Sequence, residues 1–282
     1  MCGLAVAARL AAQAPSPIVT ELPPSTRSAA LAGAGVALVG DAGSVFINPS
    51  GLATIKVLSL EGAFSPMPGG AQLWQGAGAF RLRQFNLGGG IAYLQLPDTS
   101  AFADNFTWVG SADFRVGLLA LGASLRYVSV ADTSGQLNSA LTTDAGFTIA
   151  VFDIMALAVS VQGIGNERLS GLGVSLPTTT RLGYTLNFVD PQGTIRLLTT
   201  IEWVWTEGQN HRFLVGLEGG AVLKGMGVVG RVGYGPAPFG PSAARWTVGG
   251  GVVLGRLGLD YAYQAQNVFG EGVHAFGLRL TP

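Results

Sequence analysis

Few residues of this sequence have the chemistry of an active site or a metal site. The chain contains one cysteine, Cys2, and two histidines, His211 and His274. Disulfide frameworks and Cys/His metal sites need several such residues at close spacing, so neither is expected. No G-x-S-x-G motif is present, and a membrane enzyme is therefore the least favoured reading. The sequence predicts no catalytic residue, no cofactor and no metal.

One motif resembles a nucleotide-binding loop. Residues 225–230 match G-x-G-x-x-G. A dinucleotide site needs a strand before this motif, a helix after it and an acidic residue roughly 20 positions further on. Here a strand is expected after the motif, and Gly250 stands near the place of the acid. We interpret the motif as a tight turn followed by small strand residues.

The remaining polar residues of interest are charged side chains that fall on one face of alternating segments. Buried charges must be paired to be tolerated. We therefore expect them to pair with one another and with the N-terminal segment, and a polar conduction path is the second interpretation. Beside Arg81, Asp113, Arg115, Arg126, Asp144 and Arg245, the predicted inward-facing polar network consists of Arg181, Arg196, Glu202, Arg212, Glu218, Asp260 and Arg279.

The composition indicates which elements carry these charges. Charged residues make up 11% of the 282 residues, and 43 residues are glycine. Soluble domains carry about 25% charged residues. No uninterrupted apolar run reaches the ~18 residues of a membrane-spanning helix. Hydrophobicity spread over short alternating segments is typical of a membrane β-barrel, in which each strand exposes one face to lipid.

About fourteen segments after residue 57 alternate in this way. Strands of about ten residues suffice to cross the outer-membrane core when they are tilted. The sequence therefore predicts an all-β, antiparallel transmembrane barrel over residues 58–282. The expected strands are 58–64, 72–82, 85–96, 106–116, 118–129, 142–152, 154–164, 178–188, 194–205, 211–222, 227–234, 245–254, 256–264 and 272–280.

The connections between these segments alternate between long and short. Outer-membrane barrels have short periplasmic turns and longer extracellular loops, and this order predicts the orientation of the chain. All five tryptophans, Trp74, Trp108, Trp203, Trp205 and Trp246, fall near the ends that would be extracellular. Phenylalanines such as Phe80 and Phe114 fall near the other ends. Two such aromatic belts are expected of a barrel in a membrane.

The first fourteen residues have a different character. Residues 1–14 end in a small-x-small pattern before Pro15, although the basic start of a secretory signal is missing. We interpret them as the end of a truncated signal peptide, and an unprocessed disordered end is the alternative. The net charge of zero and the absence of a basic run argue against nucleic acid as a partner.

Residues 15–57 lack strand alternation and are predicted to form a periplasmic or luminal plug. They contain the block 33–53, in which Asn48-Pro49-Ser50-Gly51 has turn chemistry. Asp41, Asn48, Pro49 and Gly51 form the candidate plug motif, and Asp41 and Asn48 are its expected polar anchors.

The same block carries a family resemblance. GAGVALVGDAGSVFINPSGLA (33–53) resembles the N-terminal signature of the PorV/PorQ family, relatives of the FadL-type transporters of hydrophobic compounds. Weaker similarities, such as Asp260-Tyr261-Ala262, continue to the end. The chain departs from the family pattern at Ser50, where alanine is usual, and in its Thr281-Pro282 terminus. The resemblance implies a fourteen-stranded barrel.

Two functions remain open at this level. The first is FadL-like passage of small hydrophobic molecules across the bacterial outer membrane, where outer-membrane lipid would surround the barrel. The second is a non-conducting PorV/PorQ-like component of a type IX secretion or surface-attachment apparatus, with secretion-system proteins as partners. The sequence does not separate them.

Overall fold

The structure is a computed structural model, and it describes most of the chain. The described residues are 17–97, 102–132, 136–151, 154–165, 169, 176–190, 193–236, 244–265 and 272–282. The predicted signal peptide lies outside them.

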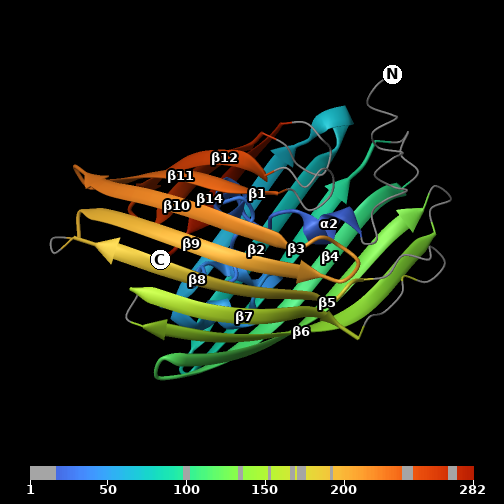
Figure 1. Ribbon diagram of the computed structural model, residues 1–282, viewed down its shortest axis with the longest axis horizontal. Helices are drawn as coiled ribbons and strands as arrows, with labels where there is room; N and C mark the ends of the chain where they lie inside the picture. The colour runs from blue at the N-terminus through green and yellow to red at the C-terminus, as the bar shows by residue number, and fades with distance from the viewer. Residues whose placement is uncertain are drawn as a thin grey trace.

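Fourteen antiparallel strands form one closed barrel, which confirms the predicted fold (Figure 1). Each strand pairs with its neighbours in sequence, and β1 closes the barrel against β14 through a register that runs from Leu60–Leu280 to Phe64–Phe276. The strands are β1 Leu58–Pro66, β2 Gln72–Leu82, β3 Phe85–Gln95, β4 Phe102–Val116, β5 Leu119–Asp132, β6 Leu137–Val151, β7 Met155–Ile164, β8 Thr179–Val189, β9 Ile195–Thr206, β10 Arg212–Leu223, β11 Met226–Pro236, β12 Ala244–Leu254, β13 Leu257–Gln264 and β14 Val273–Leu280.

Two strands begin well before their predicted starts. β4 begins at Phe102 and β6 at Leu137, several residues before the predicted starts at 106 and 142. In both strands an asparagine, Asn105 or Asn138, pairs with Val130 of β5 and continues the ladder. The sequence missed these extensions because polar residues interrupt the apolar alternation, whereas backbone hydrogen bonding does not depend on side-chain type.

The two faces of the wall differ as predicted. In β9, Ile195, Leu197 and Trp203 are exposed on the outside, whereas Thr200 and Glu202 are buried on the inside. All five tryptophans lie on the outer face and are exposed. Where side chains are described, the charged strand residues follow the inward register, apart from Asp104, which accepts a hydrogen bond from the Tyr93 hydroxyl.

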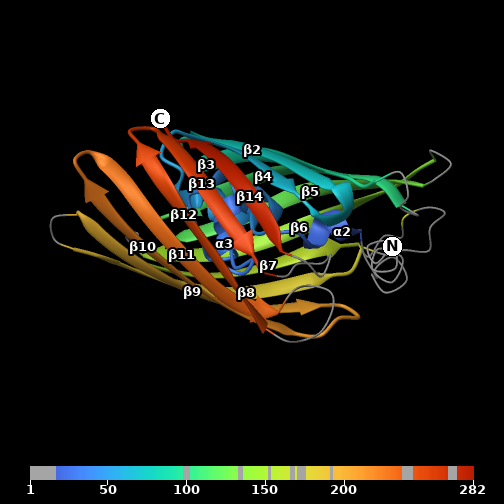
Figure 2. The ribbon, with the colours of Figure 1, turned by 90° about the horizontal axis from the view of Figure 1, so that it is seen from above.

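The N-terminal segment lies inside the barrel (Figure 2). Residues 17–57 are called the plug below. The plug contains two short α-helices and two 3-10 helices: α2 Ile18–Glu21, α3 Thr26–Ala30, η1 Ala42–Phe46 and η2 Pro49–Thr54. A third 3-10 helix, η3 Pro68–Gly70, lies between β1 and β2. None of the helices among the described residues is long and apolar enough to cross a membrane.

One rim of the barrel is formed by tight turns. Two-residue connections join β2 to β3, β4 to β5, β10 to β11 and β12 to β13. Gly117 and Gly255 have φ values of 59° and 61°, in the left-handed region that such turns require. The C-terminus lies at this rim, because β14 runs toward it, and α2 lies toward the opposite rim, which carries the longer connections (Figure 1). We call the two ends the tight-turn rim and the loop rim.

Candidate functional site

Helix α3 brings a charged side chain of the plug to the barrel wall. Ser25 caps the helix: its side chain accepts a hydrogen bond from the Ser28 N–H, and Ser28 completes a capping box. The helix can approach β11 and β12 closely because glycines face it. A Cβ atom at Gly249 would lie 2.6 Å from the Cβ of Ala30, and one at Gly233 would overlap the backbone at Ala32. Small residues of the wall thus determine the position of α3 and, with it, the position of Arg27 in the lumen.

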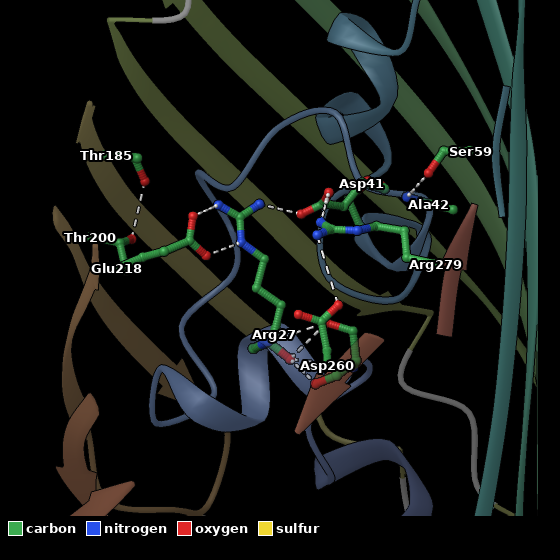
Figure 3. Close-up of polar contacts among 12 residues, drawn as sticks. Arg27, Asp41, Ala42, Ser59, Thr185, Thr200, Glu218, Asp260 and Arg279 are labelled. Carbon is green, nitrogen blue, oxygen red and sulfur yellow. Dashed lines mark hydrogen bonds and ion pairs between the residues drawn. The ribbon is translucent and has the colours of Figure 1, made fainter. Parts of the chain in front are cut away.

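Six charged side chains form a closed ring of alternating sign between the plug and the wall. Figure 3 shows its members Arg27, Asp41, Glu218, Asp260 and Arg279. Arg27 donates two hydrogen bonds to Glu218, of 2.7 and 2.8 Å, and also pairs with Asp41. The ring continues through Arg231, whose Nε lies 2.7 Å from Glu218 and whose Nη1 lies 2.5 Å from Asp260. We call this set the charge ring, and its members are Arg27, Glu218, Arg231, Asp260, Arg279 and Asp41.

Arg279 closes the ring on the other side. Its guanidinium lies 3.3 Å from Asp41 and 3.8 Å from Asp260. Arg196 adds a further ion pair to Glu218 from outside the ring. Glu218 is only 1% exposed, so an unpaired charge there would be strongly unfavourable. The ring therefore joins the plug to four strands, β10, β11, β13 and β14.

The environment keeps the plug carboxylate charged. Burial alone would raise the pKa of Asp41, but the guanidinium groups of Arg27 and Arg279 outweigh burial and hold that pKa below its ordinary value. Burial would likewise lower the pKa of Arg27, and the Asp41 and Glu218 carboxylates raise it instead. Both plug groups are thus ionised at neutral pH, and their attachment to the wall is ionic.

A second attachment uses uncharged groups. The Asn48 side chain is fully buried; its Nδ2 donates to the Val36 carbonyl (2.8 Å) and to Oγ1 of Thr148 on β6 (3.1 Å). Its Oδ1 accepts from the N–H and the hydroxyl of Ser50 and so caps η2, in which Pro49 occupies the first turn. A Cβ at Gly146 would overlap Asn48, so the wall is shaped for this contact. We call Asn48, Ser50 and Thr148 the amide anchor.

Further buried ion pairs support the connecting part of the plug. Arg181 Nη1 lies 2.7 Å from Oε1 of Glu202, and Oε2 of Glu202 accepts the N–H groups of Gly35 and Val36. Arg126 pairs with Asp144 and also donates to the Phe46 carbonyl. These side chains satisfy plug backbone groups that have no secondary-structure partner.

A weaker pair lies near the loop rim. Arg212 is 3.5 Å from Glu21 of α2, and Gln209 donates to the same carboxylate over 3.4 Å. The Arg212–Glu21 distance exceeds those between Glu218 and its partners in the charge ring, and it is shorter than the 3.8 Å between Arg279 and Asp260.

Apolar side chains cover the wall beneath α2. Val19 and Leu22 of the plug pack against a buried layer that includes Leu73, Leu94 and Val128. This layer continues along the β1–β6 side to Val45 and Phe46 of η1. Displacing α2 would expose a hydrophobic surface in the half of the lumen nearer the loop rim.

A small cavity separates α3 from β1, β2 and β14. Its lining combines Glu61, Gln75 and Arg279 with glycine and alanine positions of the wall. Gln75 donates to the Pro23 carbonyl, which holds the chain before α3 against β2. The cavity lies beside the charge ring.

The structure places every predicted site residue in the lumen. Asp41 lies in the charge ring; Asn48, Pro49 and Gly51 lie in or beside the amide anchor. The predicted network divides into separate groups: Arg196, Glu218, Asp260 and Arg279 around α3, Arg181 with Glu202 behind Val36, and Arg212 under α2. Asn48 accepts a hydrogen bond from the backbone N–H of Ser50 and donates to the Val36 carbonyl and the Thr148 hydroxyl.

Sequence reasoning missed two members of the charge ring. Arg231 shares an inward register with Val229 and Gly233, so strand parity could have identified it. Arg27 lies in a five-residue helix, which is too short to show a helical pattern of apolar residues, so no local pattern identifies Arg27 as a site residue. The plug cation is therefore defined only by the tertiary contact with Glu218.

The described part of the chain contains no candidate metal site. No three His, Cys, Asp or Glu side chains lie together in a way that could hold a metal ion in that part of the chain. His274 faces outward, with its Nδ1 at 2.8 Å from the Tyr261 hydroxyl, and His211 contacts the Trp205 ring. Both histidines thus belong to the outer surface.

Comparisons with known proteins support the fold. No protein-family model matches the sequence, and no curated protein sequence matches it. The toluene transporter TbuX of Ralstonia pickettii superposes with a TM-score of 0.61 at 11% identity, covering 93% of this chain and 99% of that one. The CymD monoaromatic hydrocarbon channel gives 0.61 at 13% identity, with coverages of 95% and 99%.

A third solved structure gives a similar result. The toluene transporter TodX of Pseudomonas putida superposes with a TM-score of 0.57 at 10% identity, covering 93% of this chain and 98% of that one. At such identities the likeness shows that the chain shares the barrel fold of these proteins along nearly its whole length.

Proposed function

We propose that this protein is an outer-membrane channel for small hydrophobic molecules, closed at rest by the plug. The observation that carries the proposal is the apolar layer beneath α2, because a hydrophobic ligand needs a dry, apolar surface within the lumen. We propose that α2 is the part of the plug that moves, because its displacement would uncover the hydrophobic layer beneath it. The hydrocarbon channels that share the fold support the same substrate class.

The outer surface supports a membrane location. Its exposed side chains are largely apolar, and aromatic rings pair across strands near the loop rim. The ring centroids of Trp203 and Phe213 lie 5.1 Å apart, and those of Tyr234 and Trp246 lie 4.8 Å apart. Such rings are favoured where lipid meets water. The orientation that follows places the loop rim outside and the tight-turn rim in the periplasm.

Uptake of radiolabelled toluene by a bacterial host without a comparable channel tests the proposal. Expression should raise the initial uptake rate above that of cells with the empty vector. A reversible lock tests whether the connecting part of the plug must move as well. In a Cys2→Ser background, Ala37→Cys and Gly183→Cys place two Cβ atoms about 3.5 Å apart, within the range of a disulfide. Val36→Ala is included, because Cγ1 of Val36 would lie 2.3 Å from the new Cβ at Gly183. Oxidation should lower uptake, and reduction should restore it.

Two results would contradict the proposal. Uptake equal to that of the empty-vector host would refute passage, and uptake unaffected by the disulfide would refute passage past this part of the plug. The PorV/PorQ resemblance supplies the alternative, a non-conducting secretion component. Background uptake together with co-purification of secretion-system proteins would favour that alternative.

A further inference from the structure

The tight-turn rim carries a cluster of exposed basic side chains. Lys56 precedes β1, and Arg83, Lys224 and Arg256 lie in three of the four two-residue turns. We call these four residues the basic rim. They include both lysines of the chain. All four side chains are exposed.

Acidic residues do not balance this charge. In the described connections of the same rim, the acidic side chain is Asp190, and it is already engaged by the Thr194 hydroxyl and the Ile195 N–H. These hydrogen bonds, the one from the Ile195 N–H first, keep the pKa of Asp190 below its ordinary value. At the loop rim, Glu207 is the charged residue of the described connections. The positive charge is thus concentrated at one end.

Backbone conformation adds an independent observation. Arg83 and Lys224 adopt positive φ values of 61° and 50°. Glycine or asparagine is normally favoured in this region, because other side chains are strained there. Basic side chains occupy these turns although the backbone would favour glycine, so a role of the charge itself is indicated.

The neighbours of the basic residues identify the partner. Leu82 and Phe85 flank Arg83, Leu223 and Met226 flank Lys224, and Leu254 and Leu257 flank Arg256; all six are exposed on the outer face. A cation directly beside an exposed apolar belt matches a phospholipid, whose charged headgroup lies directly above its acyl chains. A soluble acidic partner would leave the apolar belt uncovered.

From these features we infer that the basic rim binds anionic phospholipid headgroups in the leaflet on the tight-turn side. The inference rests on the proposed membrane location and adds a lipid preference to it. A basic side chain near an anionic membrane surface gains on the order of five-fold in affinity. Several of them should therefore enrich anionic lipid around this rim, and salt should weaken the effect.

Fluorescence quenching in vesicles tests this inference. A bimane label is attached to Gln84→Cys, next to Arg83, or to Asn210→Cys at the loop rim, each in a Cys2→Ser background. The full-length protein is inserted into phosphatidylcholine vesicles that contain a minor fraction of brominated phosphatidylglycerol or the same fraction of brominated phosphatidylcholine. We expect about three-fold or greater enrichment of phosphatidylglycerol at the first label, decreasing at high ionic strength, and no enrichment at the second.

Two variants separate charge from local structure. Replacing Lys56, Arg83, Lys224 and Arg256 together by glutamine should abolish the enrichment. Exchanging lysine and arginine at the same four positions should retain it. Equal quenching by both brominated lipids in the wild-type protein would overturn the inference, as would enrichment that survives the glutamine variant.

The proposed membrane location is tested separately in the same preparation. Insertion into vesicles of pure phosphatidylcholine is followed by flotation and by the shift in gel mobility on heating. Failure to insert there would refute the membrane location and with it the inference. Insertion without any lipid preference would refute the inference alone.

Discussion

Glu218→Gln should loosen the plug more than any other single change of charge in the lumen. Glu218 accepts hydrogen bonds from Arg27, Arg196 and Arg231 and is almost completely buried. Removing one partner of a buried ion pair destabilises by about 3–5 kcal/mol. The lower value applies here, because Arg27 keeps Asp41 and Arg231 keeps Asp260. A loss of about 3 kcal/mol corresponds to a roughly 100-fold change in the docking equilibrium.

The docking equilibrium can be measured with a buried cysteine. Ala34 is fully buried in the plug, so Ala34→Cys in a Cys2→Ser background reacts with an aqueous maleimide only when the plug opens. Glu218→Gln should raise the reaction rate by about 100-fold. Arg196→Gln should change it much less, because the Arg196 side chain is 43% exposed and its interaction is screened by water.

A rate within two-fold of the parent protein would show that the charge ring does not hold the plug. Folded barrel must be confirmed for each variant by its gel mobility without heating. A barrel that no longer assembles would show instead that Glu218 supports the wall itself, which also contradicts a role confined to the plug.

Three further predictions follow from the same structure. Gly146→Ala should weaken plug docking by about 1–3 kcal/mol through overlap with the plug's buried asparagine, whereas Gly220→Ala, on the same inward face but with ordinary contacts, should leave the maleimide rate unchanged. Leu259→Arg should destabilise the barrel by about 2–4 kcal/mol in urea titrations of refolded protein, because Leu259 faces outward. A cysteine at position 259 should react with a lipid-soluble reagent and a cysteine at position 260 with an aqueous one. The reverse pattern would refute the assigned register. The lowered pKa of Asp41 contributes stability that is complete above the unfolded-state value of about 4 and is lost as the pH falls through the lower folded value. Pepsin cleavage of the plug, divided by its cleavage of an unstructured peptide at the same pH, should therefore accelerate only below about pH 4, and this acceleration should be smaller in Asp41→Asn.

The number of strands and the side of the wall on which each side chain lies were predictable, because both depend on local patterns. Alternation at a period of two places Ile195, Leu197 and Trp203 outside and Glu202 inside, whatever the rest of the chain does. Strand ends were less predictable. β4 and β6 extend past the apolar pattern because Asn105 and Asn138 pair with β5 through backbone groups, which the side-chain pattern does not encode.

The plug shows the limit of sequence reasoning most clearly. Asp41 and Asn48 were predicted as anchors because their side chains can accept hydrogen bonds, a property that is visible in the sequence. Their partners were not visible. Thr148 lies 100 residues beyond Asn48, and Arg279 lies 238 residues beyond Asp41.

By itself the sequence determined a barrel with apolar side chains outside and polar side chains inside, preceded by a segment of small residues. It could do so because composition and the two-residue period of a strand are properties of neighbouring residues. The tertiary structure alone decided which charges meet. Barrel closure brings β10, β11, β13 and β14 around α3, and only then do Arg27 and Asp41 of the plug complete a ring with Glu218, Arg231 and Asp260. Ion pairing depends on distance in space, and chain closure sets that distance independently of any local pattern.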